Sequence, residues 1–189
     1  VLRKMIKKER ESLTKSDISI TRLTGTTLTK SIWDQFYNFY LNTINRKWGE
    51  AYLTREFFNL ISEKMSSQIL LIVAKKNGEI IAGALNFIGE DTLYGRNWGS
   101  LIKIPFLHFE LCYYQAIEFA IEKKLKFVEA GAQGPHKISR GYIAKPTYSY
   151  HYIPNQSFSN AVSRFIQYET NQISKQINIV NSEKNPYKD

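Results

Sequence analysis

The sequence predicts a mixed α/β (α+β) fold, in which a largely antiparallel sheet is flanked by helices. Three strand-like runs joined by tight turns occupy the middle of the chain, and apolar residues recur with helical spacing before and after them. The content of 43% hydrophobic and 14% aromatic residues is enough to build a core. Because 189 residues suit one domain, we expect a single domain over residues 1–180 and a frayed polar tail over residues 181–189.

The first third of the chain predicts helices around one short strand. Residues 1–12 form a basic helical pattern, which is either an exposed end or a surface that contacts phosphate, and residues 18–23 alternate as a strand. Apolar residues at helical spacing over 32–44 predict a helix capped by Thr27 or Thr29, and a second helix opens at Thr54.

A loop containing Arg46 and Trp48 separates these two helices. Its sequence, RKWG, is typical of a helix C-terminus, where cations complement the helix dipole and glycine closes the turn. The alternative interpretation is that Arg46 and Trp48 form a wall of a substrate groove.

Residues 69–98 give the clearest β signal. A strand is predicted over residues 69–75, of which 69–74 are continuously apolar, and the dipeptide Asn77-Gly78 predicts a type I′ hairpin turn into a strand over 79–88. A second turn leads to a third strand over 92–98, so we expect an antiparallel meander.

A long helix over residues 106–124 should follow Pro105. Its expected buried stripe comprises Phe109, Cys112, Tyr113, Ala116, Ile117, Ala120 and Ile121. Cys112 is therefore interpreted as a core residue and not as a nucleophile. Residues 126–130 then predict another strand of the same sheet, residues 147–153 alternate as a further strand, and residues 157–177 form a last helix with one apolar side.

The stretch FVEAGAQGPHKISRGY, residues 127–142, carries most of the reactive chemistry. It places glycines beside a carboxylate, an amide, an imidazole and two cations: Glu129, Gln133, His136, Lys137 and Arg140. Such a mixture suits general acid–base chemistry and anion binding. The alternative is an ordinary strand-to-helix loop whose charges are solvated.

Charge and cysteine content bear on partners and location. The net charge of +9 favours anionic ligands such as a nucleotide pyrophosphate, RNA or an anionic membrane face, although a solvated lysine-rich surface would give the same value. No apolar run is long enough to span a bilayer and no secretory signal opens the chain. The single Cys112 fits a reducing compartment, so we expect a cytoplasmic protein. His108, His136 and His151 lack metal-ligand spacing, and no metal is predicted.

The element order, a meander followed by a helix and a strand, is that of the GNAT acyltransferase fold. The segments GAQGPHKISRGYIAKPTYSYHYI, DTLYGRNWG, PFLHFELCYYQAIEFAIE and NRKWGEAYLTREFF closely resemble a FemAB-like family of N-acyltransferases named for peptidoglycan biosynthesis or recognition. The resemblance extends to about Ile153. Because members of that family are roughly twice as long, it implies the C-terminal half of a tandem-GNAT protein.

The resemblance implies transfer of an acyl or aminoacyl group to an amine, with a peptidoglycan precursor as a candidate acceptor. Glu129 is then the candidate base or amine-orienting group, and His136 is the alternative base. Tyr142 is a candidate proton donor to the leaving group, although packing would explain it equally well. Lys137 and Arg140 would hold a phosphate or the substrate carboxylate.

Other residues complete the predicted substrate site. Arg96 and Trp98, on the third meander strand, are expected to face the same cleft as Glu129, and Gln133, Arg46 and Trp48 join the substrate-binding set.

The donor is left open between acyl-CoA and aminoacyl-tRNA. GNAT enzymes that use acetyl-CoA carry a glycine-rich pyrophosphate loop before the long helix, whereas this chain reads GRNWGSLIKIPFLHF and only Arg96 and Gly99 match the pattern. We therefore expect weak binding of acetyl-CoA. The charge is compatible with aminoacyl-tRNA, but RNA-recognition motifs are absent. The alternative function is a non-catalytic GNAT-like module that binds a cell-wall precursor or an anionic polymer.

Overall fold

The computed structural model describes residues 2–46, 49–132 and 134–184. The chain divides into two compact units, Arg3–Gly131 and a second unit from Ala132 onward. Each unit has its own local structure, and the expectation of one domain over residues 1–180 stays a prediction.

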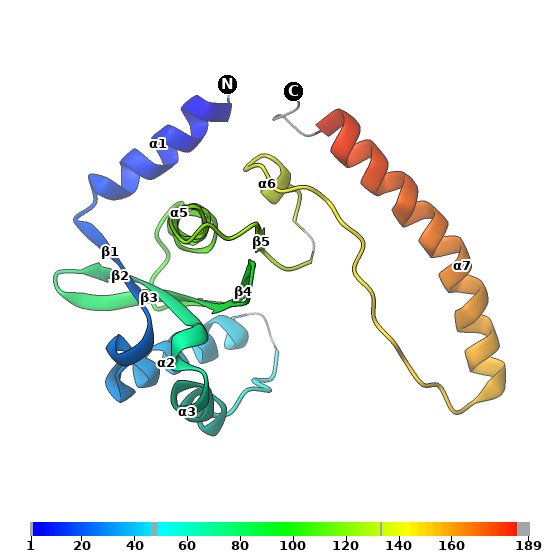
Figure 1. The fold of residues 1–189 in the computed structure, drawn as a ribbon, viewed down its shortest axis with the longest axis horizontal. Coiled ribbons are helices and arrows are strands. Elements are labelled where there is room, and N and C mark those ends of the chain that lie inside the picture. The colour runs from blue at the N-terminus through cyan, green and yellow to red at the C-terminus, as the bar shows by residue number, and fades with distance from the viewer. Residues whose placement is uncertain (1, 47–48, 133, 185–189) are drawn as a thin grey trace. The chain divides into compact units, whose positions relative to one another are not determined.

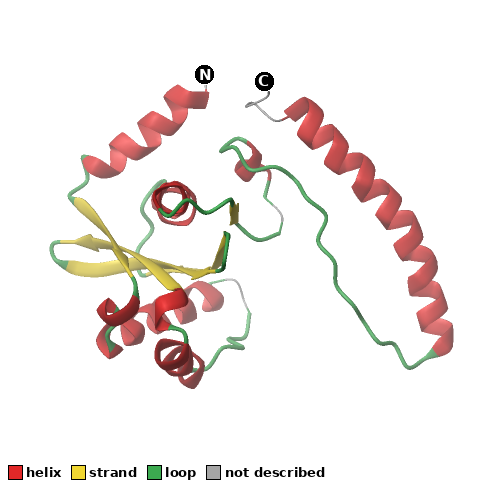
Figure 2. Ribbon diagram, in the orientation of Figure 1, coloured by secondary structure: helices red, strands yellow, loops and turns green. Residues whose placement is uncertain are grey.

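A five-stranded sheet forms the centre of the first unit (Figures 1 and 2). The strands lie in chain order: β1 (Ile18–Leu23), β2 (Ile69–Lys76), β3 (Glu79–Ile88), β4 (Thr92–Ser100) and β5 (Phe127–Glu129). Neighbours from β1 to β4 are antiparallel, and β5 pairs with β4 in parallel. Asn77 and Gly78 both adopt positive φ, as a type I′ turn requires. The predicted meander and its extension by the strand after the long helix are confirmed.

Helices cover both faces of this sheet. The first unit contains α1 (Leu2–Thr14), α2 (Lys30–Asn45), α3 (Arg55–Lys64), α4 (Leu107–Phe109) and α5 (Gln115–Glu122), with short 3₁₀ turns at Gly25–Thr27 and Ser66–Gln68. A π-helical turn, η3 (Glu110–Tyr114), joins α4 to α5, so the predicted long helix is interrupted. The side chains of Thr29 and Thr54 accept hydrogen bonds from Ile32 N and Phe57 N, which caps α2 and α3.

Two hydrophobic clusters lie on opposite sides of the sheet. On the α2–α3 side the buried residues include Trp33, Phe36, Phe39, Tyr40, Phe58, Leu71 and Leu85. On the α4–α5 side they include Leu13, Leu70, Ile72, Leu93, Leu107, Leu111 and Phe119. Strand β2 contributes to both clusters, which explains why its sequence is a continuous apolar run and does not alternate with polar residues. One residue of the predicted helical stripe, Ile121, is exposed, so its assignment to the core was wrong.

A network of charged side chains joins the N-terminal segments to α5. Arg10 donates to both carboxylate oxygens of buried Glu110 at 2.9 and 3.0 Å and to Glu118 at 2.6 Å. Arg22 donates to Glu118 at 2.9 Å and to Gln115 at 2.9 Å. Burial alone would lower the pKa of the Arg10 guanidinium, but its bonds to Glu118 and Glu110 raise it. Arg10, which the sequence analysis placed on an exposed end or a phosphate-contacting surface, pairs instead with Glu110 and Glu118 and holds α1 to the rest of the first unit.

The second unit contains little regular structure besides one long helix. It comprises α6 (Pro135–Ile138), an extended segment, α7 (Gln156–Ile179) and a π-helical turn, η4 (Val180–Lys184). The Asn181 side chain forms two hydrogen bonds of 2.8 Å with the backbone of Ala144. Residues 185–189 of the expected polar tail lie outside the described residues.

The predicted strand over residues 147–153 is wrong. The segment pairs with no strand among the described residues, and Tyr148, Tyr150 and Tyr152 are each more than four-fifths exposed. Alternation in sequence favours a strand, but a strand forms only where a ladder partner is available. The described part of α7 also contains no buried residue.

Candidate acyl-transfer site

The pairing between β4 and β5 ends part of the way along β4. The parallel register runs from Thr92 opposite Phe127 to Tyr94 opposite Glu129. Strand β5 ends there, whereas β4 continues to Ser100. Beyond Glu129, the outer edge of β4 therefore has no paired strand within the first unit. Unpaired backbone at a strand edge is available to hydrogen-bond a ligand.

A β-bulge lies in β4 at the same place. Asn97 is opposite Leu85 and Gly95 is opposite Asn86, so Arg96 has no register partner on β3. A bulge of this kind disrupts the ladder locally, bends the strand and shifts the alternation of side chains by one residue. Bulges are common next to active sites for that reason. The register thus places the bulge at Arg96, directly after Gly95.

Arg96 lies on the α2–α3 side of the sheet. Its NH2 donates to the hydroxyl of Tyr52 at 2.9 Å, and its Cζ lies 5.9 Å from the centre of the same ring. Tyr52 in turn meets the buried Tyr40 of α2 edge to face, with 6.5 Å between the ring centres. The loop between α2 and α3 therefore positions this guanidinium.

Glu129 shares that side of the sheet. Its neighbour Val128 packs against the hydrophobic cluster on the α4–α5 side, so alternation along β5 places Glu129 on the opposite side. Its register partner Tyr94 is exposed. Glu129 is itself exposed, which leaves the carboxylate accessible to an amine in solution.

Trp98 lies on the other side of the sheet. It packs against the α4–α5 cluster and meets His108 edge to face, with 5.3 Å between the ring centres. The expectation that Arg96 and Trp98 face one cleft is therefore wrong. The physical reason is the bulge, because it reverses the alternation that an unbroken strand would give between these two positions.

Trp98 belongs instead to a groove between the end of α2 and the start of α4, which we call the β4–α4 groove. Its volume is about 400 Å³, and its lining includes Thr43, Arg46, Trp98, Ile102, Lys103 and Phe106. Arg46 donates from NH2 to the carbonyl of Leu101 at 2.9 Å, so one predicted binding residue does line a groove. Trp48 lies outside the described residues. The sequence analysis did not assign Lys103 or Phe106 to the site, although the apolar residues around Lys103 in the segment LIKIPF could have indicated a binding surface.

Three predicted residues of the second unit form a compact local turn. The carbonyl of His136 accepts hydrogen bonds from Arg140 NH1 and from the Ser139 hydroxyl, both at 2.8 Å. Lys137 Nζ donates to the carbonyl of Ala132 at 3.2 Å. Arg140 is buried although it is charged, and these bonds hold it in place. Gln133 lies outside the described residues.

The His136 imidazole favours its neutral form. Partial burial lowers its pKa below the ordinary value of 6.5, and the charges of Arg140 and Lys137 lower it further. A neutral imidazole at neutral pH can accept a proton, which is what a general base requires. Tyr142 is half-buried, and its backbone N–H donates to the carbonyl of Lys137 at 3.2 Å.

The fold defines the class of protein. Two structures of the aminoglycoside acetyltransferase meta-AAC0020, from an uncultured soil metagenomic sample, match the chain. The complex with trehalose has a TM-score of 0.52 and 14% identity, and covers 74% of this chain and 97% of the other. The complex with sisomicin has a TM-score of 0.54 and 11% identity, and covers 75% and 99%. At such low identity the match shows the fold alone, which is the GNAT acyltransferase fold.

The family follows from the sequence. The model of the FemAB-like family, described as peptidoglycan biosynthesis/recognition, matches residues 2–189, and the chain belongs to this family. No curated protein sequence matches the chain. None of the helices in the described part of the chain is long and apolar enough to cross a bilayer.

Proposed function

We propose that this protein is an N-acyltransferase that moves an acyl or aminoacyl group to an amine of a peptidoglycan precursor. Membership of the FemAB-like family and the acetyltransferase fold support this class of reaction. The observation that carries the proposal is the position of Glu129. It is an exposed carboxylate at the point where β5 ends, on the same side of the sheet as Arg96 at the bulge of β4.

The chemistry needs a proton acceptor for the attacking ammonium and donors for the developing oxyanion. Glu129 accepts the proton, directly or through a water molecule, and the neutral amine attacks the carbonyl carbon of the donor. The unpaired edge of β4 beyond Tyr94 offers backbone groups for the carbonyl oxygen. A new C–N bond forms, and the donor's thiol or ribose hydroxyl leaves with a proton.

The second unit contains the other residues that the sequence analysis assigned to the reaction, and their roles stay proposals. His136 is the alternative base, because its lowered pKa keeps it neutral at neutral pH. Tyr142 is the proposed proton donor to the leaving group. Lys137, Arg140 and Gln133 would bind the donor phosphate or the acceptor carboxylate.

The donor remains one of two classes, acyl-CoA or aminoacyl-tRNA. The β4–α4 groove, with Arg46 and Lys103 in its lining, lies where the edge of β4 ends and offers cations to the phosphates of either donor. The residues before α4 are bulky, which supports weak binding of acetyl-CoA.

The test compares Glu129→Gln with the matched variant Glu90→Gln. Glu90 is another exposed carboxylate, in the turn before β4, so it controls for the loss of one charge. Amide product is measured by mass spectrometry with a peptidoglycan precursor as acceptor and each donor in turn. We expect kcat to fall by about 10²–10⁴-fold in Glu129→Gln and to stay unchanged in Glu90→Gln.

Two outcomes would contradict this assignment. Equal turnover by Glu129→Gln and the parent would remove Glu129 as the base, and His136→Ala would then be the decisive variant. If the parent forms no product with either donor, yet binds the precursor and loses that binding in Lys137→Ala, the chain is a recognition module.

A further inference from the structure

The loop between β4 and α4, residues 101–106, presents three large apolar side chains to solvent. Leu101, Ile102 and Phe106 are 48%, 42% and 40% exposed. Single exposed apolar residues are normal on any protein, and Leu60 on α3 and Ile121 on α5 are examples. These three differ because they belong to one six-residue loop at the mouth of the β4–α4 groove, whose lining is mainly apolar.

Hydrogen bonds from α2 and from Arg46, which directly follows it, hold the start of the loop. Asn42 Nδ2 donates to the carbonyl of Ser100 at 2.6 Å, and Arg46 NH2 donates to the carbonyl of Leu101 at 2.9 Å. Phe106 adopts a left-handed conformation with φ of 64°, which is unfavourable for a bulky residue. Ile104, by contrast, packs into the core on the α4–α5 side. These contacts anchor the start of the loop and Ile104, while the side chains of Leu101, Ile102 and Phe106 are exposed.

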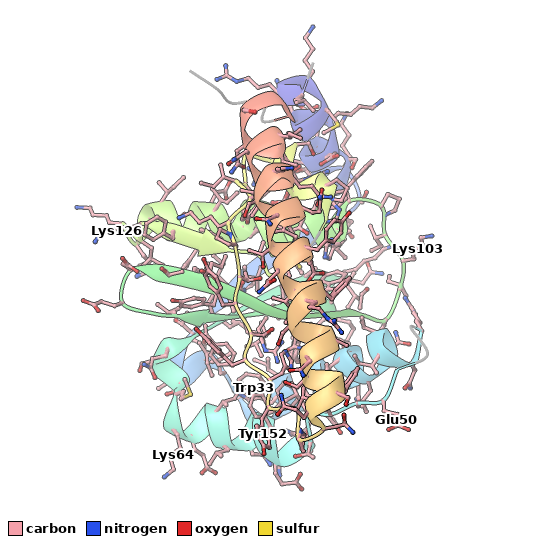
Figure 3. All side chains as sticks on the ribbon, turned by 90° about the vertical axis from the view of Figure 1, so that its right-hand side faces the viewer. Trp33, Glu50, Lys64, Lys103, Lys126 and Tyr152 are labelled. Carbon is pink, nitrogen blue, oxygen red and sulfur yellow. The ribbon has the colours of Figure 1, made fainter. Side chains whose placement is uncertain are left out.

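Two cationic side chains lie beside this apolar surface. Arg46 and Lys103 line the groove, and no carboxylate is among the described residues of the lining. Figure 3 shows the Lys103 side chain extending outward from the ribbon. The protein as a whole carries a net charge of +9, so its long-range field also attracts anions.

We propose that the loop over residues 101–106 docks the protein onto an anionic phospholipid bilayer. Leu101, Ile102 and Phe106 enter the boundary between headgroups and acyl chains, while Lys103 and Arg46 contact the headgroup phosphates. Apolar side chains flanked by cations have the pattern of an interfacial membrane anchor, in which both burial and electrostatic attraction contribute. A soluble anion would use the cations but would leave the exposed apolar side chains without a role.

This inference goes beyond the proposed transfer reaction and gives Arg46 and Lys103 a second role, beside the contact with donor phosphates proposed above. A protein that acts on lipid-attached or lipid-adjacent amines would gain a high local concentration of acceptor at such a surface. The binding itself requires neither donor nor turnover, so it can fail or succeed separately from the proposed catalysis.

The experiment is co-sedimentation of the full chain with vesicles, without any donor. One set of vesicles is phosphatidylcholine alone, and the other contains equal parts of phosphatidylcholine and phosphatidylglycerol. We expect binding to the anionic vesicles that falls at least about tenfold in the double variant Ile102→Ser with Phe106→Ser, since each substitution removes an exposed apolar side chain that would be buried in the bilayer. Lys103→Gln should lower binding by about fivefold.

The matched control is the double variant Leu60→Ser with Ile121→Ser, which removes two apolar side chains that are more exposed and lie on other surfaces. It should bind anionic vesicles as the parent does. All the substituted side chains are exposed, and circular dichroism checks that each variant is folded.

Two results would overturn the proposal. The first is that Ile102→Ser with Phe106→Ser binds anionic vesicles as the parent does. In that case the net charge of the protein alone would explain the binding. The second is full competition by soluble glycerol phosphate, which would show an anion site in the groove and no bilayer anchor.

Discussion

The two units of the chain differ in how their residues are held in place. The first unit, Arg3–Gly131, contains two hydrophobic clusters, and many of its aromatic and aliphatic side chains are almost fully buried. In the second unit Arg140 is the sole buried residue among those the structure describes. Glu129 and Arg96 are thus presented by a packed sheet, whereas His136 and Lys137 depend on hydrogen bonds within one short turn.

The proposed site residues of the two units are therefore oriented in two different ways. Side chains on packed strands are oriented by the whole core, so core substitutions should disturb them. A turn held by local hydrogen bonds can unfold independently of the core, so its conformation should change mainly when nearby residues are substituted.

The largest expected effect comes from emptying the core of the first unit. Phe58 is fully buried and contacts the rings of Trp33, Phe36 and Tyr40. Phe58→Ala should lower the free energy of unfolding by about 3–5 kcal/mol, because it removes a buried ring and leaves a cavity. Chemical denaturation measures this loss. Phe165→Ala, an exposed ring on α7, should change stability by less than about 0.5 kcal/mol. Similar losses of stability in both variants would contradict the difference in packing between the two units.

A smaller effect is expected from adding one methyl group to a glycine in each unit. A Cβ at Gly99 would lie 2.3 Å from the backbone of Phe39, where β4 packs directly on α2. Gly99→Ala should therefore cost about 2–3 kcal/mol of global stability, since backbone must move to admit the methyl group.

Gly134→Ala tests the same change in the second unit. Gly134 has a φ of 105°, and a Cβ there would lie 2.7 Å from the His136 ring. We expect the turn and the imidazole to shift while the unfolding of the first unit, followed by tryptophan fluorescence, stays within about 0.5 kcal/mol of the parent. A full loss of stability in Gly134→Ala would show that the turn is part of the same cooperative core.

The smallest effect concerns the protonation of His136. Partial burial of its ring and the charges of Arg140 and Lys137 lower its folded-state pKa below 6.5. The unfolded chain therefore binds the proton more tightly than the folded chain. The stability that this residue contributes is complete above pH 6.5 and is lost as the pH falls through the lower folded-state value.

Ring titration by NMR, in the folded chain and in urea, measures both pKa values. Lys137→Ala should move the folded-state pKa of His136 upward, because one repelling charge is removed. A folded-state pKa at or above the value in urea would contradict the environment described for the turn.

Local sequence patterns determined most of the secondary structure of the first unit. The dipeptide Asn77-Gly78 predicted the hairpin because both positions need positive φ, and Thr54 predicted the start of α3 because its hydroxyl caps an unpaired N–H. These signals depend on residues close in the chain, so no distant partner is needed to interpret them. The resemblance of whole segments to the FemAB-like family likewise required only the sequence, and the family is confirmed over residues 2–189.

Tertiary structure decided the features that depend on distant partners. Residues 147–153 alternate like a strand, but no neighbour among the described residues pairs with them. Arg10 looked like part of a basic surface until Glu110 and Glu118, a hundred residues away, were placed beside it. The bulge at Arg96 follows from the register with β3, and it alone puts Arg96 and Trp98 on opposite sides of the sheet. Sequence specifies which residues tend to form a strand, whereas the orientation of each side chain is set by the ladder that the strand joins.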